Sequence, residues 1–197
     1  MRCRAGLRLL AGPCCARCGA PAAWPVARCR ECSGRRLAFS SARAAVAYDR
    51  PVARLVAAWK ERGLRRIAGF AAELVADVVS APRADALTFV PPDNERNLKR
   101  GHHPAARLAD ELSERWSLDV LELLSRPGWQ RPQRGLPLAS RRRNVRSAFR
   151  PRGEAPRRVV LIDDVYTSGA TVAAAASALR KVGARRVDVV TFARAVR

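Results

Sequence analysis

The strongest constraint on the fold is residues 159–171, which read VVLIDDVYTSGAT. The apolar β-forming residues at the start of this stretch predict a buried central strand. Asp163 and Asp164 emerge at the carboxyl end of that strand, and a short loop then leads to a helix expected to begin at about Thr171. A strand, loop and helix in this order are typical of an open α/β sheet, in which ligands bind at the carboxyl ends of the strands.

The rest of the chain alternates between strand and helix patterns. Apolar residues at helical spacing predict helices over residues 52–59, 64–79, 104–116 and 171–182, and short apolar runs predict strands over 44–48, 87–90, 147–149 and 186–192. Residues 126–146 are rich in Pro, Gly and Arg and are long for an ordinary connection. We therefore predict a mainly parallel α/β sheet flanked by helices over residues 41–197.

The loop after the acidic pair has the composition of an anion-binding site. Gly169 allows close backbone approach, and Thr167, Ser168 and Thr171 add hydroxyl donors. Backbone N–H groups at the start of the following helix suit a phosphate, and two adjacent carboxylates beside them indicate a vicinal diol, a Mg²⁺ ion, or both. The plainer alternative, in which the carboxylates only cap the helix, accounts for one acidic residue but not for two. A Walker A loop is excluded, because no Gly-Lys-Ser/Thr sequence follows the strand.

All six cysteines lie within the first 32 residues, in a segment with few aliphatic side chains. Two C-x₂-C pairs are separated by ten residues, and they are Cys15 with Cys18 and Cys29 with Cys32. This spacing predicts a closed four-thiolate site for structural Zn²⁺, with Cys14 as an alternative to Cys15 in the first pair. Because such a segment cannot build a hydrophobic core of its own, metal binding would fold it. We predict a small zinc-binding module over residues 1–40.

The chain is strongly basic, with 38 Lys and Arg against 17 Asp and Glu and a net charge of +21. GC-rich codon usage explains why Arg outnumbers Lys better than it explains the excess of basic over acidic residues. A field of this size attracts polyanions, so nucleic-acid binding and a charge without function both stay open. No apolar run is long enough to cross a bilayer or to form a secretory signal, so we expect a cytoplasmic protein without membrane insertion.

Residues 159–171 closely resemble the motif that binds 5-phosphoribosyl-1-pyrophosphate (PRPP) in type I phosphoribosyltransferases, with Ser168 in place of the commoner Thr. The resemblance implies that Asp163 and Asp164 hold the ribose hydroxyls and are the catalytic candidates. It also implies that Mg²⁺ binds together with PRPP, on its pyrophosphate and hydroxyls. The residues implied to bind the 5-phosphate are Thr167, Ser168, Gly169, Ala170 and Thr171.

Two further segments fit the same family. The strand that ends at Pro91 and Pro92 resembles the start of a pyrophosphate loop, in which the basic side chains would bind the leaving group; these are Arg96, Lys99 and Arg100. Residues 126–146 stand in the place of the flexible catalytic hood. The alternative for the first segment is a solvated basic turn, and the alternative for residues 126–146 is a merely disordered basic loop. His102 and His103 follow the first segment, where we expect them at the start of a helix.

A four-Cys knuckle before such a core resembles the ComF family of competence proteins, and the resemblance covers nearly the whole chain. Its motifs include Lys60 with Gly63, the Lys99-Arg100-Gly101 run and residues 190–194, whereas His102-His103-Pro104 replaces the usual Phe-Asn-Gln. The family implies a cytoplasmic protein linked to uptake of transforming single-stranded DNA and working with a helicase-like ATPase, and chains of this fold often form homodimers.

Among the tryptophans, Trp24 and Trp129 are the better candidates for base stacking, since Trp59 and Trp116 lie on apolar helix faces. The alternative function is an active phosphoribosyltransferase of nucleobase or nucleotide metabolism without a DNA role. The sequence shows no acceptor-binding signature, so the acceptor of such a transfer stays open.

Overall fold

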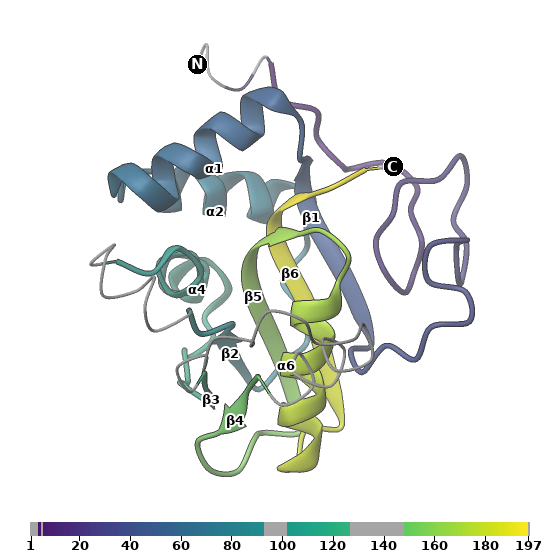
Figure 1. Cartoon of the computed structure of the whole chain (residues 1–197), viewed down its shortest axis with the longest axis vertical. Helices are drawn as coiled ribbons and strands as arrows, with labels where there is room; N and C mark the ends of the chain where they lie inside the picture. Colours follow the sequence, from purple (N-terminus) through teal and green to yellow (C-terminus); the bar gives the residue numbers. More distant parts are fainter. Residues whose placement is uncertain (1–3, 5, 93–101, 127–147, 197) are drawn as a thin grey trace, which may run out of the picture.

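The computed structural model describes residue 4 and residues 6–92, 102–126 and 148–196. In these residues four parallel strands form the central sheet in the order β1-β6-β5-β2 (Figure 1). The strands are β1 (Ser41–Ala47), β2 (Ala86–Phe89), β5 (Arg158–Tyr166) and β6 (Arg186–Arg194). The predicted parallel α/β sheet is therefore confirmed.

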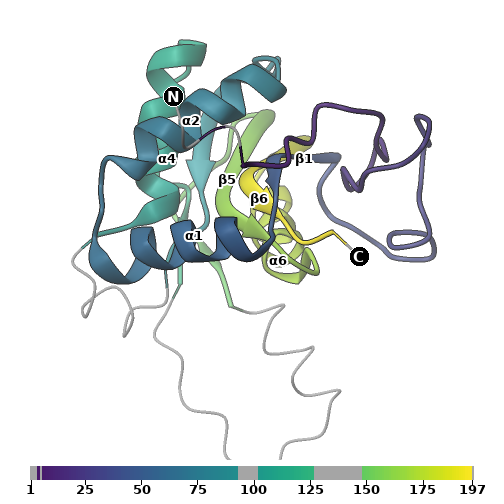
Figure 2. The ribbon, with the colours of Figure 1, turned by 90° about the horizontal axis from the view of Figure 1, so that it is seen from above.

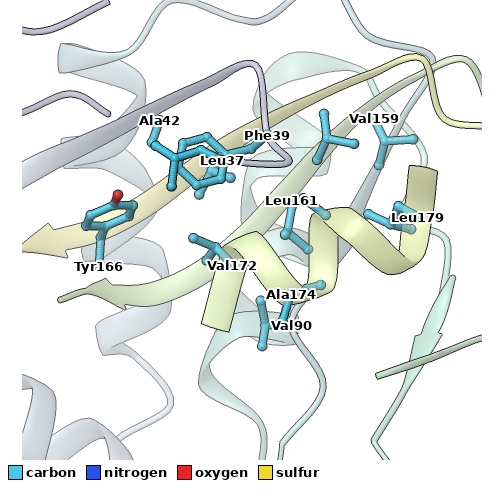
Figure 3. Packing of buried hydrophobic residues seen from close by; sticks show 14 of the residues in the cluster. Leu37, Phe39, Ala42, Val90, Val159, Leu161, Tyr166, Val172, Ala174 and Leu179 are labelled. Atoms are coloured by element: carbon cyan, nitrogen blue, oxygen red, sulfur yellow. The ribbon is translucent and has the colours of Figure 1, made fainter. Parts of the chain in front are cut away.

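Helices cover both faces of the sheet, which explains why its strands are apolar on both sides. Val160 and Ile162 of β5 pack against the helices of one face, which are α1 (Arg50–Arg62), α2 (Ile67–Val78) and α4 (Pro104–Trp116). Val159 and Leu161 point to the opposite face, where α6 (Ala170–Lys181) lies (Figure 3). The loop at the carboxyl end of β5 therefore follows a strand that is buried on both faces.

The helix starts follow from local capping chemistry. Asp49 caps α1 by accepting the Val52 N–H at 3.1 Å. The expected place of His103 at a helix start is confirmed, because its Nδ1 accepts the Ala106 N–H at 2.9 Å at the beginning of α4. At the other end of α1, Gly63 adopts φ 63°, a left-handed conformation that favours glycine.

The predicted edge strand at residues 147–149 is misplaced: residue 147 lies outside the described residues, and residues 148 and 149 are not in a strand. The strand pairing lies further along the chain, where β4 (Arg150–Pro151) runs antiparallel to β3 (Leu124–Ser125). The Phe149 side chain is instead buried in the cluster on the α6 face, which accounts for an apolar residue at this position. Strand β5 also extends beyond residue 162, so both aspartates lie within it and not after it.

The N-terminal segment, with the cysteines, lies beyond β1 at the edge of the sheet (Figures 1 and 2). Its described residues form isolated bridges instead of strands, among them Cys15 with Val26 and Leu9 with Val46. Cys15, Leu37 and Phe39 nevertheless belong to the same buried cluster as the α6 face of the sheet. The segment is therefore docked on the core. Among the described residues, no helix has both the length and the apolar character to span a membrane.

Candidate phosphate and metal sites

The acidic pair lies near the carboxyl end of β5. Asp164 is 8% exposed, and its carboxylate forms an ion pair with the Lys60 ammonium group at the end of α1. Asp163 is half-buried, and its Oδ1 accepts the backbone N–H of Asp164 at 2.9 Å. The two carboxyl groups are thus adjacent, and one of them has a cation beside it.

Desolvation raises the pKa of the Asp163 carboxyl to about 8, and the neighbouring charge of Asp164 adds to the shift. Lys60 acts in the opposite direction but more weakly. Burial likewise lowers the pKa of His103 to about 4, so that this imidazole is neutral near pH 7. The site therefore holds a carboxyl group that gains its charge above neutral pH, or earlier when a cation or a hydroxyl donor approaches.

The loop after the acidic pair leads directly into α6. Thr167, Ser168 and Thr171 are exposed, and Gly169 has φ 74° at the N-cap position of the helix. Gly169 supplies no side-chain cap, and the Ser168 hydroxyl accepts the Ala170 N–H in a long hydrogen bond of 3.4 Å. The N–H groups of this first turn carry the positive end of the helix dipole and suit an anionic ligand. The helix begins at Ala170, one residue before the expected start.

Lys60 is a site residue that the motifs do not predict as one, although α1 brings it to Asp164. A signal was present, because lysine is rare among the 38 basic residues of a chain that otherwise uses arginine. The predicted pyrophosphate-binding residues Arg96, Lys99 and Arg100 lie outside the described residues. So do residues 127–146 of the predicted hood.

The four cysteines of the predicted metal site converge. Their sulfur atoms all lie within 4.8 Å of one another, with Cys15 and Cys32 at 3.6 Å, Cys18 and Cys29 at 3.4 Å, and Cys29 and Cys32 at 3.9 Å. A tetrahedral site with Zn–S bonds of about 2.3 Å has sulfur–sulfur edges of about 3.8 Å, so this set fits a metal without rearrangement. Cys14 is not part of the cluster, and Cys15 supplies the thiol instead.

Comparisons with known proteins agree with this arrangement. A family model described as "Phosphoribosyl transferase domain" matches residues 60–196. Competence protein F of Haemophilus influenzae is 30% identical over 197 residues, which cover 93% of this chain and 85% of that protein. DNA utilization protein YhgH is 30% identical in both Salmonella typhimurium and Escherichia coli K12, with 89% of this chain and 81% of each relative covered. The chain belongs to the ComF family.

The extent of these matches shows which parts of this ComF-family protein are similar to the family model and to the relatives. The phosphoribosyltransferase model begins at Lys60 and includes the acidic pair and the loop. Competence protein F aligns with 93% of the chain, which is more than residues 60–196 can supply, so the likeness extends into the N-terminal segment. The likeness to Competence protein F is therefore not confined to the phosphoribosyltransferase region.

Proposed function

We propose that this ComF-family protein binds Mg-PRPP at the end of β5 and single-stranded DNA on its basic surface, and that it handles DNA during natural transformation. The observation that carries the first part is the start of α6, with Gly169 at its N-cap, beside the two carboxyl groups. The names of the relatives, a competence protein and DNA utilization proteins, support the second part.

The chemistry of the site fits a phosphorylated ribose. The hydroxyls of Thr167, Ser168 and Thr171 and the first N–H groups of α6 would surround the 5-phosphate. Asp163 and Asp164 would accept hydrogen bonds from the ribose hydroxyls. When bound together with the pyrophosphate, Mg²⁺ would neutralise part of its charge. Together these groups hold and orient the ligand, with the Lys60 ammonium group beside them.

Calorimetric titration of Mg-PRPP into the zinc-loaded protein tests this site. Asp164→Asn removes one of the proposed ribose contacts and is expected to abolish measurable binding. The matched control is Asp188→Asn, because Asp188 is also 8% exposed but lies in β6, where it pairs with Arg186. Equal binding by the two variants would reject the site. Acceptor-dependent release of pyrophosphate would assign the protein a transferase activity.

The cysteine segment has features that suit both a metal ion and DNA. We propose that Zn²⁺ occupies the four-Cys cluster and gives this loop-rich segment a fixed shape. Trp24 is 69% exposed within that segment, and Arg28 and Arg30 are exposed near it in sequence. An exposed aromatic ring among cations is suited to stack on a base while the cations bind phosphates.

Fluorescence anisotropy of a labelled single-stranded oligonucleotide tests the DNA part. We expect affinity to fall with salt at a log–log slope of about −0.7 for each phosphate neutralised. Trp24→Ala should weaken binding by about 1–3 kcal/mol, the range for loss of one base stack. Tyr48→Ala, which removes a 37% exposed aromatic outside the segment, should leave binding unchanged. Affinity independent of salt, or equal losses in both variants, would reject this part.

A further inference from the structure

Arg194, the last residue of β6, is buried with 1% of its surface exposed. Its Nη1 donates to the Cys18 carbonyl oxygen at 2.7 Å. Its Nη2 donates to the Glu31 carboxylate at 2.7 Å and lies 3.9 Å from the Cys18 sulfur. A buried guanidinium is costly unless it is paired. Here every one of these partners comes from residues 15–32, which we call the Cys module.

The same guanidinium also contacts Tyr166, the residue just before residues 167–171, which we call the phosphate loop. Its Cζ lies 4.4 Å from the centroid of the Tyr166 ring, a cation–π contact at the end of β5. Tyr166 in turn packs edge-to-face on Phe39, with the ring centroids 6.3 Å apart (Figure 3). Gly169 lies so close to the Tyr166 ring that a Cβ on this glycine would collide with the hydroxyl oxygen. Tyr166 therefore fixes the backbone at the start of α6.

A second link runs from the chain just after the Cys module to the same loop. The Arg35 Nη2 donates to the Ser168 carbonyl oxygen at 2.8 Å. Arg35 follows Cys32 closely, and its backbone N–H donates to the Cys32 carbonyl oxygen at 3.2 Å. The loop is thus held through Tyr166 at its start and through Ser168 in its middle, and both contacts depend on the fold around the cysteines.

We propose that the Cys module positions the phosphate loop through Arg194, Tyr166 and Arg35, so that metal loading of the four cysteines raises affinity for a phosphoribosyl ligand. This inference rests on the proposed function, since it concerns the same loop. A metal-loaded module holds the Cys18 carbonyl and Glu31 around Arg194, whereas an unloaded module releases them. Coupling between two sites is reciprocal, so the ligand must raise metal affinity by the same factor.

The reciprocal effect gives the first test, using ribose 5-phosphate because it lacks a pyrophosphate that would chelate zinc. The zinc affinity of the full chain is measured by chelator competition, with and without the ligand. We expect the ligand to tighten zinc binding at least fivefold, within the range of about 5–150-fold typical of allosteric coupling. The gain should shrink in Arg35→Ala and disappear in Arg194→Lys. Ligand binding without any gain in zinc affinity overturns the proposal.

The control is Arg180→Ala, which should keep the full gain. Arg180 donates to the Ala38 carbonyl oxygen at 2.7 Å, so it also joins the sheet domain to the chain after the Cys module, but this hydrogen bond lies away from the loop. An equal loss of the gain in Arg180→Ala and Arg35→Ala would show a general structural effect, and it would overturn the assignment of Arg35.

Amide hydrogen exchange tests the positioning of the loop separately from ligand binding, so it distinguishes failure of this inference from failure of the proposed function. Exchange over residues 167–173 is compared between the unliganded zinc-loaded wild type and zinc-loaded Arg35→Ala, so that the chain stays folded. We expect faster exchange in this segment of the variant and unchanged exchange in α4, which packs on the opposite face of the sheet. Equal exchange over residues 167–173 overturns the positioning role.

Discussion

The phosphate loop and the Cys module are in contact, but different forces hold them. The loop follows β5, whose apolar residues are buried between two layers of helices. The Cys module has a cluster of thiols at its centre. Arginine side chains donate to backbone carbonyl oxygens around it. Arg43 donates to Ala16 within the module at 3.2 Å, and Arg17 donates to Leu37 in the chain that joins the module to the sheet at 2.6 Å. Part of the basic excess is therefore structural and is not free to bind a polyanion.

The largest expected effect concerns the proposed metal, which should stabilise the Cys module and not the sheet. The purified protein should contain about one zinc per chain, and Cys32→Ser should lose it, because apparent zinc binding energies in small fingers reach about 10–16 kcal/mol. Cys14→Ser should retain the metal, since Cys14 lies outside the cluster. Elemental analysis of both variants decides the point, and metal loss in Cys14→Ser would contradict the assignment.

A core substitution in the sheet should act in the opposite way. Leu161 is fully buried against α6, so Leu161→Ala should lower the free energy of unfolding by about 2–5 kcal/mol with the zinc still bound. Leu121→Ala, at a position 38% exposed, should change it by less than about 1 kcal/mol. Denaturant unfolding with parallel zinc analysis measures both. Loss of zinc from folded Leu161→Ala would mean that zinc binding also depends on the core of the sheet.

These two regions also differ in how far the sequence predicts them. The structure of residues 159–171 can be predicted because the strand, the carboxylates and the loop follow one another in sequence, and each depends on neighbouring residues. The ion pair of Lys60 with Asp164 and the contact of Arg194 with Cys18 join residues far apart in the chain, the second pair by 176 positions. Periodicity and motif spacing contain no information on such pairs. The cysteine spacing predicted the cluster but not its docking on the loop.

Two glycines with nearly equal φ angles allow a direct comparison of the regions. Gly169 in the loop has φ 74°, and Gly34 after the Cys module has φ 71°. Alanine at either position strains the backbone by about 1–3 kcal/mol, but only at Gly169 would its Cβ also meet the Tyr166 ring. Gly169→Ala should therefore lose more stability and should weaken Mg-PRPP binding. Thermal unfolding and calorimetry measure these effects, and equal losses would show that Tyr166 does not constrain the loop.

The smallest expected effect is a pH dependence specific to the loop. The folded pKa of Asp163 is about 8 against an ordinary value of 3.8, so its burial destabilises the fold increasingly from about pH 4 to 8 and fully above that. The carboxylate form accepts the ribose hydrogen bonds, so affinity for Mg-PRPP should rise about tenfold from pH 7 to 9. Asp163→Asn should lack this rise, and zinc content should not change. A rise that persists in the variant would assign it to another group.

The most direct measurement of the central claim is a crystal structure of the zinc-loaded protein with Mg-PRPP. The account predicts 5-phosphate oxygens within hydrogen-bonding distance of the N–H groups of residues 168–171, and ribose hydroxyls on Asp163 and Asp164. At the opposite, amino ends of the strands, the chain has a pocket lined by Arg83, Arg158 and Arg186. A ligand bound there, with the loop empty, would contradict the account.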